Sequence, residues 1–102
     1  MRNSLGCVAV IVMLATTACT RTNDFTPVAG SAGKDIFQAA CAECHTKNDN
    51  GVYFELDGEM ASVEAIAEKV NAGGFMMPAF PNIVDDPMAR LSQYVLENSA
   101  KP

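Results

Sequence analysis

Apolar side chains recur at helical spacing in three stretches of this 102-residue chain. The pattern predicts one helix from about Ser31 or Ala32 into Cys41, a second after Ser62 and a third from about Pro87. The apolar faces of these helices would be formed by Ile36, Phe37, Ala40 and Cys41; by Val63, Ile66, Ala67 and Val70; and by Met88, Leu91, Tyr94 and Val95. Three such helices, each with one face to bury, predict an all-α domain.

Polar and conformationally special residues mark the ends of the second and third helices. We expect the Ser62 side chain to cap the start of the second helix, and Gly73-Gly74 to end it in a left-handed conformation. We expect Asp86 to cap the third helix, with Pro87 at its first position, where the missing N–H costs no hydrogen bond.

Residues 1–18 have the pattern of an export signal. Arg2 supplies a positive start, residues 5–15 are apolar, and Thr16-Thr17-Ala18 forms a small-residue exit. The apolar run is shorter than the about 20 residues that a membrane-spanning helix needs. We therefore predict a signal peptide over 1–18 and a mature domain on the periplasmic side of the cytoplasmic membrane.

Cys19 follows this segment directly and resembles the lipidated cysteine of bacterial lipoproteins. Such a cysteine becomes the mature N-terminus, and its acyl chains anchor the protein to the membrane. The usual pattern has a leucine three residues before the cysteine, where this chain has Thr16. A lipid anchor at Cys19 is therefore our prediction, and soluble periplasmic export after cleavage behind Ala18, or an uncleaved anchor, stays open as the alternative.

A polar stretch without apolar periodicity separates Cys19 from the first predicted helix. Residues 19–31 contain Pro27 and Gly30, which favour an irregular chain, so we predict a flexible tether there. The remaining residues, 32–102, form the predicted domain, and the length of the chain allows no second one.

The charge of the chain narrows the class of partner. Twelve acidic residues against seven basic ones give a formal net charge of −5, and no cluster of Lys and Arg occurs. This balance argues against nucleic acid as a partner and is typical of a solvated surface.

The stretch Cys41-Ala42-Glu43-Cys44-His45 carries the strongest chemical signal in the sequence. C-x-x-C-H is the attachment site of a c-type haem, in which the two thiols bind the vinyl groups and the imidazole becomes the proximal iron ligand. A thioredoxin-like redox pair would need a βαβ pattern around it, and a zinc site would need further Cys or His residues downstream. The sequence has neither, so we predict one covalent haem c held by Cys41, Cys44 and His45.

A methionine is the expected ligand on the other side of the iron. His45 is the only histidine, so this chain offers no second imidazole, and a thioether is the remaining soft donor. Of the six methionines, two lie in the predicted signal peptide and two lie beside or inside predicted helices as core fillers. The other two, Met76 and Met77, lie in a loop held by Pro78 and Pro81.

From about Gly33 to Glu97 the chain resembles the small class I c-type cytochromes. Three features appear in the family's order: a Gly and an aromatic residue before C-x-x-C-H, a Met-Pro-x-Phe loop, and an aromatic residue on the last helix. In this chain they are Gly33 and Phe37, Met77 to Phe80, and Tyr94.

The resemblance implies an all-α fold of about three main helices around one covalent haem. It assigns the distal iron ligand to Met77, directly before Pro78, with Met76 as the alternative. It also implies that Tyr94 packs against Gly33 and Phe37, where the first and last helices cross. Aromatic and apolar residues of the loop after the motif are expected to wall one edge of the haem, namely Val52, Tyr53, Phe54 and Leu56.

We interpret the protein as a one-electron carrier between membrane or periplasmic redox proteins. Two filled axial positions leave no place for a small-molecule substrate, and no nucleophile–base pair occurs, so we expect a monomeric carrier and not an enzyme. Three alternatives stay open: an electron-accepting haem subunit of a dehydrogenase, a haem sensor or enzyme with a displaceable distal methionine, and a thiol–disulfide protein.

Overall fold

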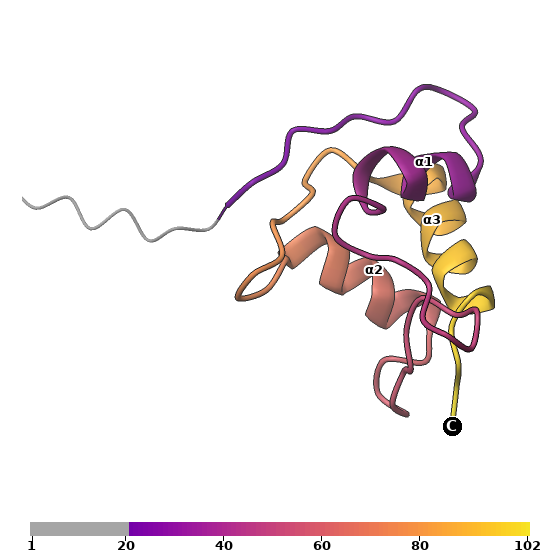
Figure 1. The fold of residues 1–102 in the computed structure, drawn as a ribbon. Coiled ribbons are helices and arrows are strands. Elements are labelled where there is room, and N and C mark those ends of the chain that lie inside the picture. Colours follow the sequence, from indigo (N-terminus) through magenta and orange to yellow (C-terminus); the bar gives the residue numbers. More distant parts are fainter. Residues whose placement is uncertain (1–20) are drawn as a thin grey trace, which may run out of the picture.

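The computed structural model describes residues 21–102, which form three helices and no strand. Helix α1 spans Gly33–Ala40, α2 spans Val63–Ala72 and α3 spans Asp85–Glu97 (Figure 1). The all-α prediction is therefore confirmed, and each helix begins within about two residues of its predicted start. The predicted signal peptide and Cys19 lie outside the described residues. Within these residues, no helix has the length and apolar character needed to cross a membrane.

Helices α1 and α3 cross at Gly33, which is buried. A Cβ atom at this position would lie 2.7 Å from the carbonyl carbon of Arg90 and 2.9 Å from the Cβ of Tyr94, so only glycine allows the observed approach. The Phe37 ring packs beside the crossing, with its centroid 5.6 Å from that of Tyr94. Arg90 of α3 also holds the chain just before α1, since its Nε donates a hydrogen bond of 2.8 Å to the Ser31 carbonyl. The predicted contact of Tyr94 with Gly33 and Phe37 is confirmed.

Helix α2 has the predicted side-chain cap at its start and ends at the predicted glycine, but that glycine does not adopt the predicted left-handed conformation. The Ser62 Oγ accepts a hydrogen bond of 3.1 Å from the Ala65 N–H, which satisfies one of the free N–H groups of the first turn. Gly73 ends the helix at φ 69°, but its ψ of −166° takes it out of the left-handed helical region. A Cβ there would lie 2.7 Å from both the Ala79 nitrogen and the Met77 oxygen, so the loop that follows folds back directly onto this glycine.

The prediction that Asp86 caps α3 is wrong. The helix begins at Asp85, its capping residue is Val84, and no side chain caps it. Asp85 takes a φ of 53°, a conformation that aspartate tolerates better than most residues. Pro87 is therefore the third helical residue rather than the first, and this is allowed because no N–H of the first turn has a partner within the helix.

The hydrophobic core lies between the three helices and the loop before α3. Ile36, Phe37, Ile83 and Leu91 are at most 1% exposed. The residue that ends α1, residues of α2 and α3, and one residue of that loop join them: Cys41, Ile66, Val70, Met88, Val95 and Phe80. All but Phe80 and Ile83 belong to the three predicted apolar faces.

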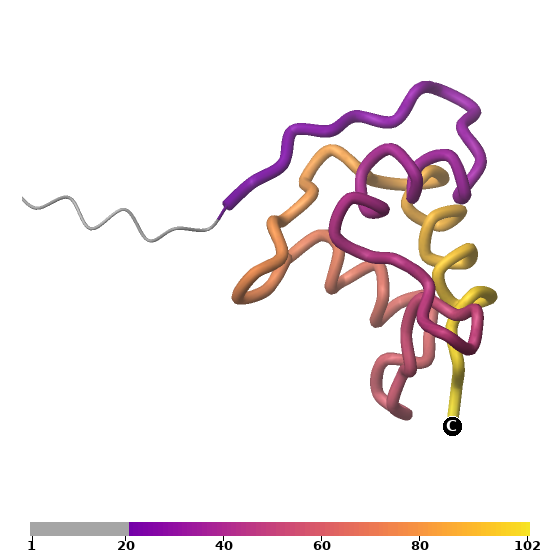
Figure 2. Tube along the Cα trace, viewed as in Figure 1, coloured from indigo at the N-terminus to yellow at the C-terminus, as the bar shows by residue number. Residues whose placement is uncertain are grey.

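Each end of the described chain pairs with one of the loops (Figure 2). At the C-terminus, Ala100 lies parallel to Glu55, with hydrogen bonds of 2.8 Å from the Leu56 N–H to the Ala100 carbonyl and from the Ala100 N–H to the Phe54 carbonyl. At the N-terminus, Thr22 lies parallel to Ala79 in the loop after α2. Residues 21–25, which we expected to be part of a free tether, are therefore bound to the domain in the structure.

We predict that Gly33→Ala lowers the free energy of unfolding by about 1–3 kcal/mol, because the new methyl group forces α1 and α3 apart. Urea unfolding of the haem-loaded protein, followed by circular dichroism, measures the change. Gly58→Ala is the matched control, since a Cβ at Gly58 would meet nothing within 4 Å; its effect should stay within about 0.5 kcal/mol. Equal stabilities of the two variants would contradict the close crossing.

Candidate haem site

The C-x-x-C-H motif forms a turn at the C-terminal end of α1. Cys41 is the residue that ends the helix, and its N–H donates a hydrogen bond of 2.8 Å to the Phe37 carbonyl. The Cys41 carbonyl then accepts hydrogen bonds from the N–H groups of Cys44, at 3.2 Å, and His45, at 2.9 Å. This turn keeps the two thiols and the imidazole on one short segment whose position is set by the crossing of α1 and α3.

The environment of the thiols argues against a thiol–disulfide protein. Burial and, to a lesser extent, the neighbouring Cys44 together raise the pKa of the Cys41 thiol to about 11. The thiol also lies at the C-terminal, negative end of a helix, which disfavours a thiolate. Redox-active C-x-x-C pairs need the opposite, namely a lowered pKa at a helix N-terminus or beside a cation.

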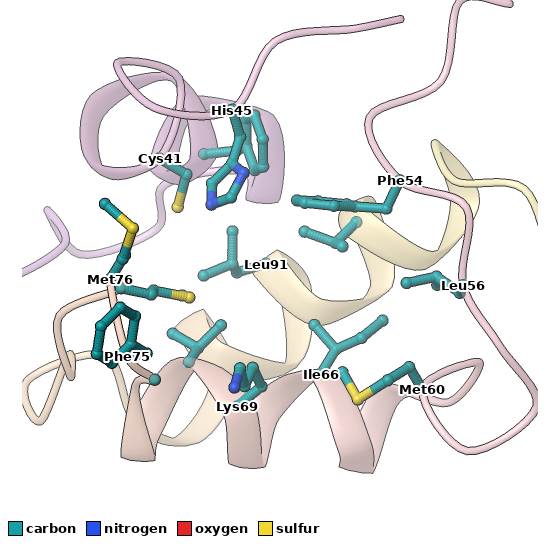
Figure 3. Close-up of a pocket in the computed structure, with 15 residues that line it drawn as sticks. Cys41, His45, Phe54, Leu56, Met60, Ile66, Lys69, Phe75, Met76 and Leu91 are labelled. Carbon is teal, nitrogen blue, oxygen red and sulfur yellow. The ribbon is translucent and has the colours of Figure 1, made fainter.

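An apolar cavity of about 400 Å³ lies between the motif, α2 and α3 (Figure 3). His45 and Cys41 enter it from the end of α1, while Ile66 and Lys69 of α2 and Leu91 of α3 line the opposite walls. The other lining residues are Phe37, Phe54, Leu56, Met60, Val70, Gly74, Phe75, Met76, Met77 and Val95. Such volume and lining are typical of a site for a cofactor.

A second cavity of about 510 Å³ borders the other side of the motif. Four residues line both cavities, namely Cys41, His45, Met76 and Met77, and Cys44 lines the second. The structure thus brings together the two cysteines, the histidine and the two candidate methionines, although the motif and the methionines are more than 30 positions apart.

The loop between His45 and α2 contributes only part of its predicted wall. Phe54 and Leu56 line the first cavity, and the Phe54 ring meets the His45 ring edge-on, with centroids 4.9 Å apart and planes at 62°. Val52 and Tyr53 do not line it. The Tyr53 ring instead packs on Phe37, at a centroid distance of 4.3 Å.

A pair of tyrosines ties this loop to α3. The hydroxyl groups of Tyr53 and Tyr94 are 3.2 Å apart, and the Gln38 side chain donates to the Tyr53 hydroxyl at 3.3 Å. The hydrogen bond to Tyr53, together with burial, raises the pKa of Tyr94 to about 12. The two tyrosines therefore connect this loop to α3 by a hydrogen bond between their hydroxyl groups as well as by their packing on Phe37.

Lys69 and Met60 are among the lining residues that the sequence did not predict as part of the site. Lys69 is the only formally charged side chain among the described residues that line the first cavity, and it lies on the wall that α2 forms (Figure 3). Met60, expected as a core filler before α2, lines the cavity as well. Sequence periodicity marks Lys69 as polar and hence external, so no signal in the sequence pointed to it.

The donor groups fit a covalent haem and no other metal site suggested by the sequence. The two cavities offer apolar walls, two cysteines on one segment, an imidazole and a thioether, which is the donor set of c-type haem attachment and ligation. Over residues 21–102, no three side chains of His, Cys, Asp or Glu come close enough to hold a metal ion, so a zinc site is absent from this part of the chain.

This fold and this donor set define a c-type cytochrome. The chain belongs to the family described as cytochrome c oxidase, cbb3-type, subunit III, whose model matches residues 28–95. It is also similar to curated proteins named cytochrome c6. The one from Cyanidioschyzon merolae is 36% identical over 77 residues, covering 68% of this chain and 74% of that protein. The one from Cyanidium caldarium is 30% identical over 103 residues, covering 90% and 94%.

The comparisons confirm the class that the sequence predicted. The protein is a small class I c-type cytochrome that binds haem c covalently, and it acts as an electron carrier between redox partners rather than as an enzyme.

Proposed function

We propose that the protein transfers single electrons between membrane or periplasmic redox proteins through one haem attached to Cys41 and Cys44 and ligated by His45 and Met77. The observation that carries this proposal is that all four residues border the second cavity, and all but Cys44 also border the first. Bound haem supplies the one-electron couple, and a methionine opposite a histidine raises its reduction potential.

The environment of the two candidate methionines supports Met77 as the distal ligand. Met77 is half-buried and packs against the core, whereas Met76 is 77% exposed. The Met77 carbonyl accepts a hydrogen bond of 2.9 Å from the Gly74 N–H, which closes a tight turn, and Pro78 restricts the backbone on the other side. A thioether held in this way loses little entropy when it binds a metal.

The remaining residues of the site keep water away from the metal and hold the two ligands in place. Phe54 contacts the imidazole from one side, and Ile66, Val70 and Leu91 form an apolar wall. A dry, apolar surrounding favours the reduced, less charged state of a haem and so adds to the effect of the methionine.

We further propose that the protein is exported as a monomer and attached to the membrane by a lipid on Cys19. The export pattern over residues 1–18 and the small residues before Cys19 support this proposal. Several acyl chains on one cysteine give stable anchoring, where a single chain would be marginal. An anchored carrier meets its partners at a raised effective concentration and needs no strong interface with them.

We predict that Met77→Ala abolishes the sulfur-ligation band of the oxidised protein and lowers its reduction potential, because the iron loses its thioether. Spectra and redox titrations of the haem-loaded variants measure both. Met76→Ala is the matched control and should leave band and potential nearly unchanged. The reverse pattern would assign the ligand to Met76.

The same pair of variants tests the sensor or enzyme alternative. Carbon monoxide should bind slowly to the reduced wild type and readily to Met77→Ala, since only the variant has an open iron position. Ready binding by the wild type would contradict the proposed electron carrier with two permanent ligands and favour a displaceable methionine.

We predict that the native protein has the mass of residues 19–102 plus one haem and a lipid, measured by intact mass spectrometry of membrane extracts. Cys19→Ser should then move the protein into the soluble fraction. A mass equal to polypeptide plus haem, with the same distribution in Cys19→Ser, would mean soluble export and would contradict the anchor.

A further inference from the structure

Residues 21–25 are paired with the loop that carries Met76 and Met77. The Asn23 N–H donates a hydrogen bond of 2.8 Å to the Ala79 carbonyl, and the Ala79 N–H donates one of 2.9 Å to the Arg21 carbonyl. Both backbone groups of Ala79 are thus bound by the N-terminal segment. Ala79 lies only two residues after Met77, so this pairing acts on the immediate neighbourhood of the proposed ligand.

Two further contacts extend the pairing on the far side of Ala79. The Asn82 side chain donates a hydrogen bond of 3.1 Å from Nδ2 to the Asp24 carbonyl. Phe25 packs against the hydrophobic core, which fixes the end of the segment. Figure 2 shows the N-terminal segment running beside the loop after α2. The segment also reaches the site itself, since Arg21 and Asn23 line the second cavity together with Cys44 and His45.

The loop has little other support on its outer side. Phe75 is fully exposed and Met76 is 77% exposed, so neither side chain anchors it. Its inner side is held by the buried Phe80, whose N–H donates a hydrogen bond of 3.0 Å to the Val70 carbonyl at the end of α2. A loop with one buried anchor and exposed side chains opens locally at a small cost in free energy.

We propose that residues 21–25 are a clamp that holds this loop closed and thereby keeps Met77 on the haem iron. This inference rests on the proposed role of Met77. It assigns a positioning role to a segment that the sequence pattern marked as a mere tether. Because the clamp works through backbone hydrogen bonds, its effect depends on the N–H of residue 23 more than on the side chain there.

Asn23→Pro tests the clamp, because proline has no N–H and removes the hydrogen bond to the Ala79 carbonyl. Asn23→Ala is the reference: it loses the same side chain, whose Oδ1 accepts a hydrogen bond of 2.9 Å from the Phe25 N–H, but it keeps the backbone donor. Loss of one backbone hydrogen bond of ordinary net strength shifts an opening equilibrium about fivefold.

In the haem-loaded proteins we expect reduced Asn23→Pro to bind carbon monoxide about fivefold faster than Asn23→Ala, because the loop must open before the gas reaches the iron. We expect faster hydrogen exchange at the Ala79 amide in the same comparison, measured by nuclear magnetic resonance. If residues 21–25 merely stabilised the whole domain, Asn23→Pro would lower the midpoint of urea unfolding. The rate of carbon monoxide binding and the exchange of the Ala79 amide would then be the same as in Asn23→Ala.

Equal gas-binding rates and equal exchange at Ala79 in Asn23→Pro and Asn23→Ala would overturn the clamp. If Asn23→Pro does not fold, Asn82→Ala carries the test, since it removes the bond to the Asp24 carbonyl from an exposed side chain and should change both quantities in the same direction. No change in either quantity in Asn82→Ala would then overturn the clamp.

A Met77→Ala variant measured in parallel separates this inference from the proposed function. If Met77→Ala keeps the sulfur-ligation band, Met77 is not the ligand, and the link from the clamp to the iron fails with it. If Met77→Ala loses the band while Asn23→Pro behaves like Asn23→Ala, the proposed function stands and the clamp alone is wrong.

Discussion

The structure depends on an apolar cavity at the centre of the domain that the protein's own side chains do not fill. Residues from all three helices face this space of about 400 Å³, and they include core residues such as Phe37, Leu91 and Val95. A domain of about 70 residues buries too little surface to leave such a space without a cofactor. Haem supplies the missing apolar mass, so folding and haem binding are expected to be one process.

The position of the cavity is set by two close backbone approaches, each of which requires a glycine. Gly33 lets α1 meet α3 and so fixes where the C-x-x-C-H turn begins, while Gly73 lets the loop after α2 return across the end of that helix. Each end of the described chain forms backbone hydrogen bonds with one loop of the site. Ala100 pairs with the loop that follows His45, and Arg21 and Asn23 pair with the loop of Met77. The two loops that line the cavities are thus each supported by a segment far away in the sequence.

Most of the fold and of the donor set could be predicted from the sequence, because both depend on local patterns. The three helical faces, the Ser62 cap and the residues of C-x-x-C-H can be identified within a few positions of each other. The features that the sequence did not predict depend on tertiary contacts. The pairing of residues 21–25 uses backbone groups that carry no sequence signal, and Lys69 is a polar residue that nevertheless lines the cavity. The start of α3 was misplaced because a proline fits several positions in a first turn.

Peptide mass spectrometry tests the central claim, a haem bound covalently through Cys41 and Cys44, most directly. Lys34 and Lys47 flank the motif, so trypsin releases both cysteines and His45 in one peptide. After denaturation, reduction and treatment with a thiol-alkylating reagent, this peptide should carry the mass of one haem and no alkyl group. A peptide with two alkylated cysteines, from a protein whose colour is extracted by acidified acetone, would contradict the account.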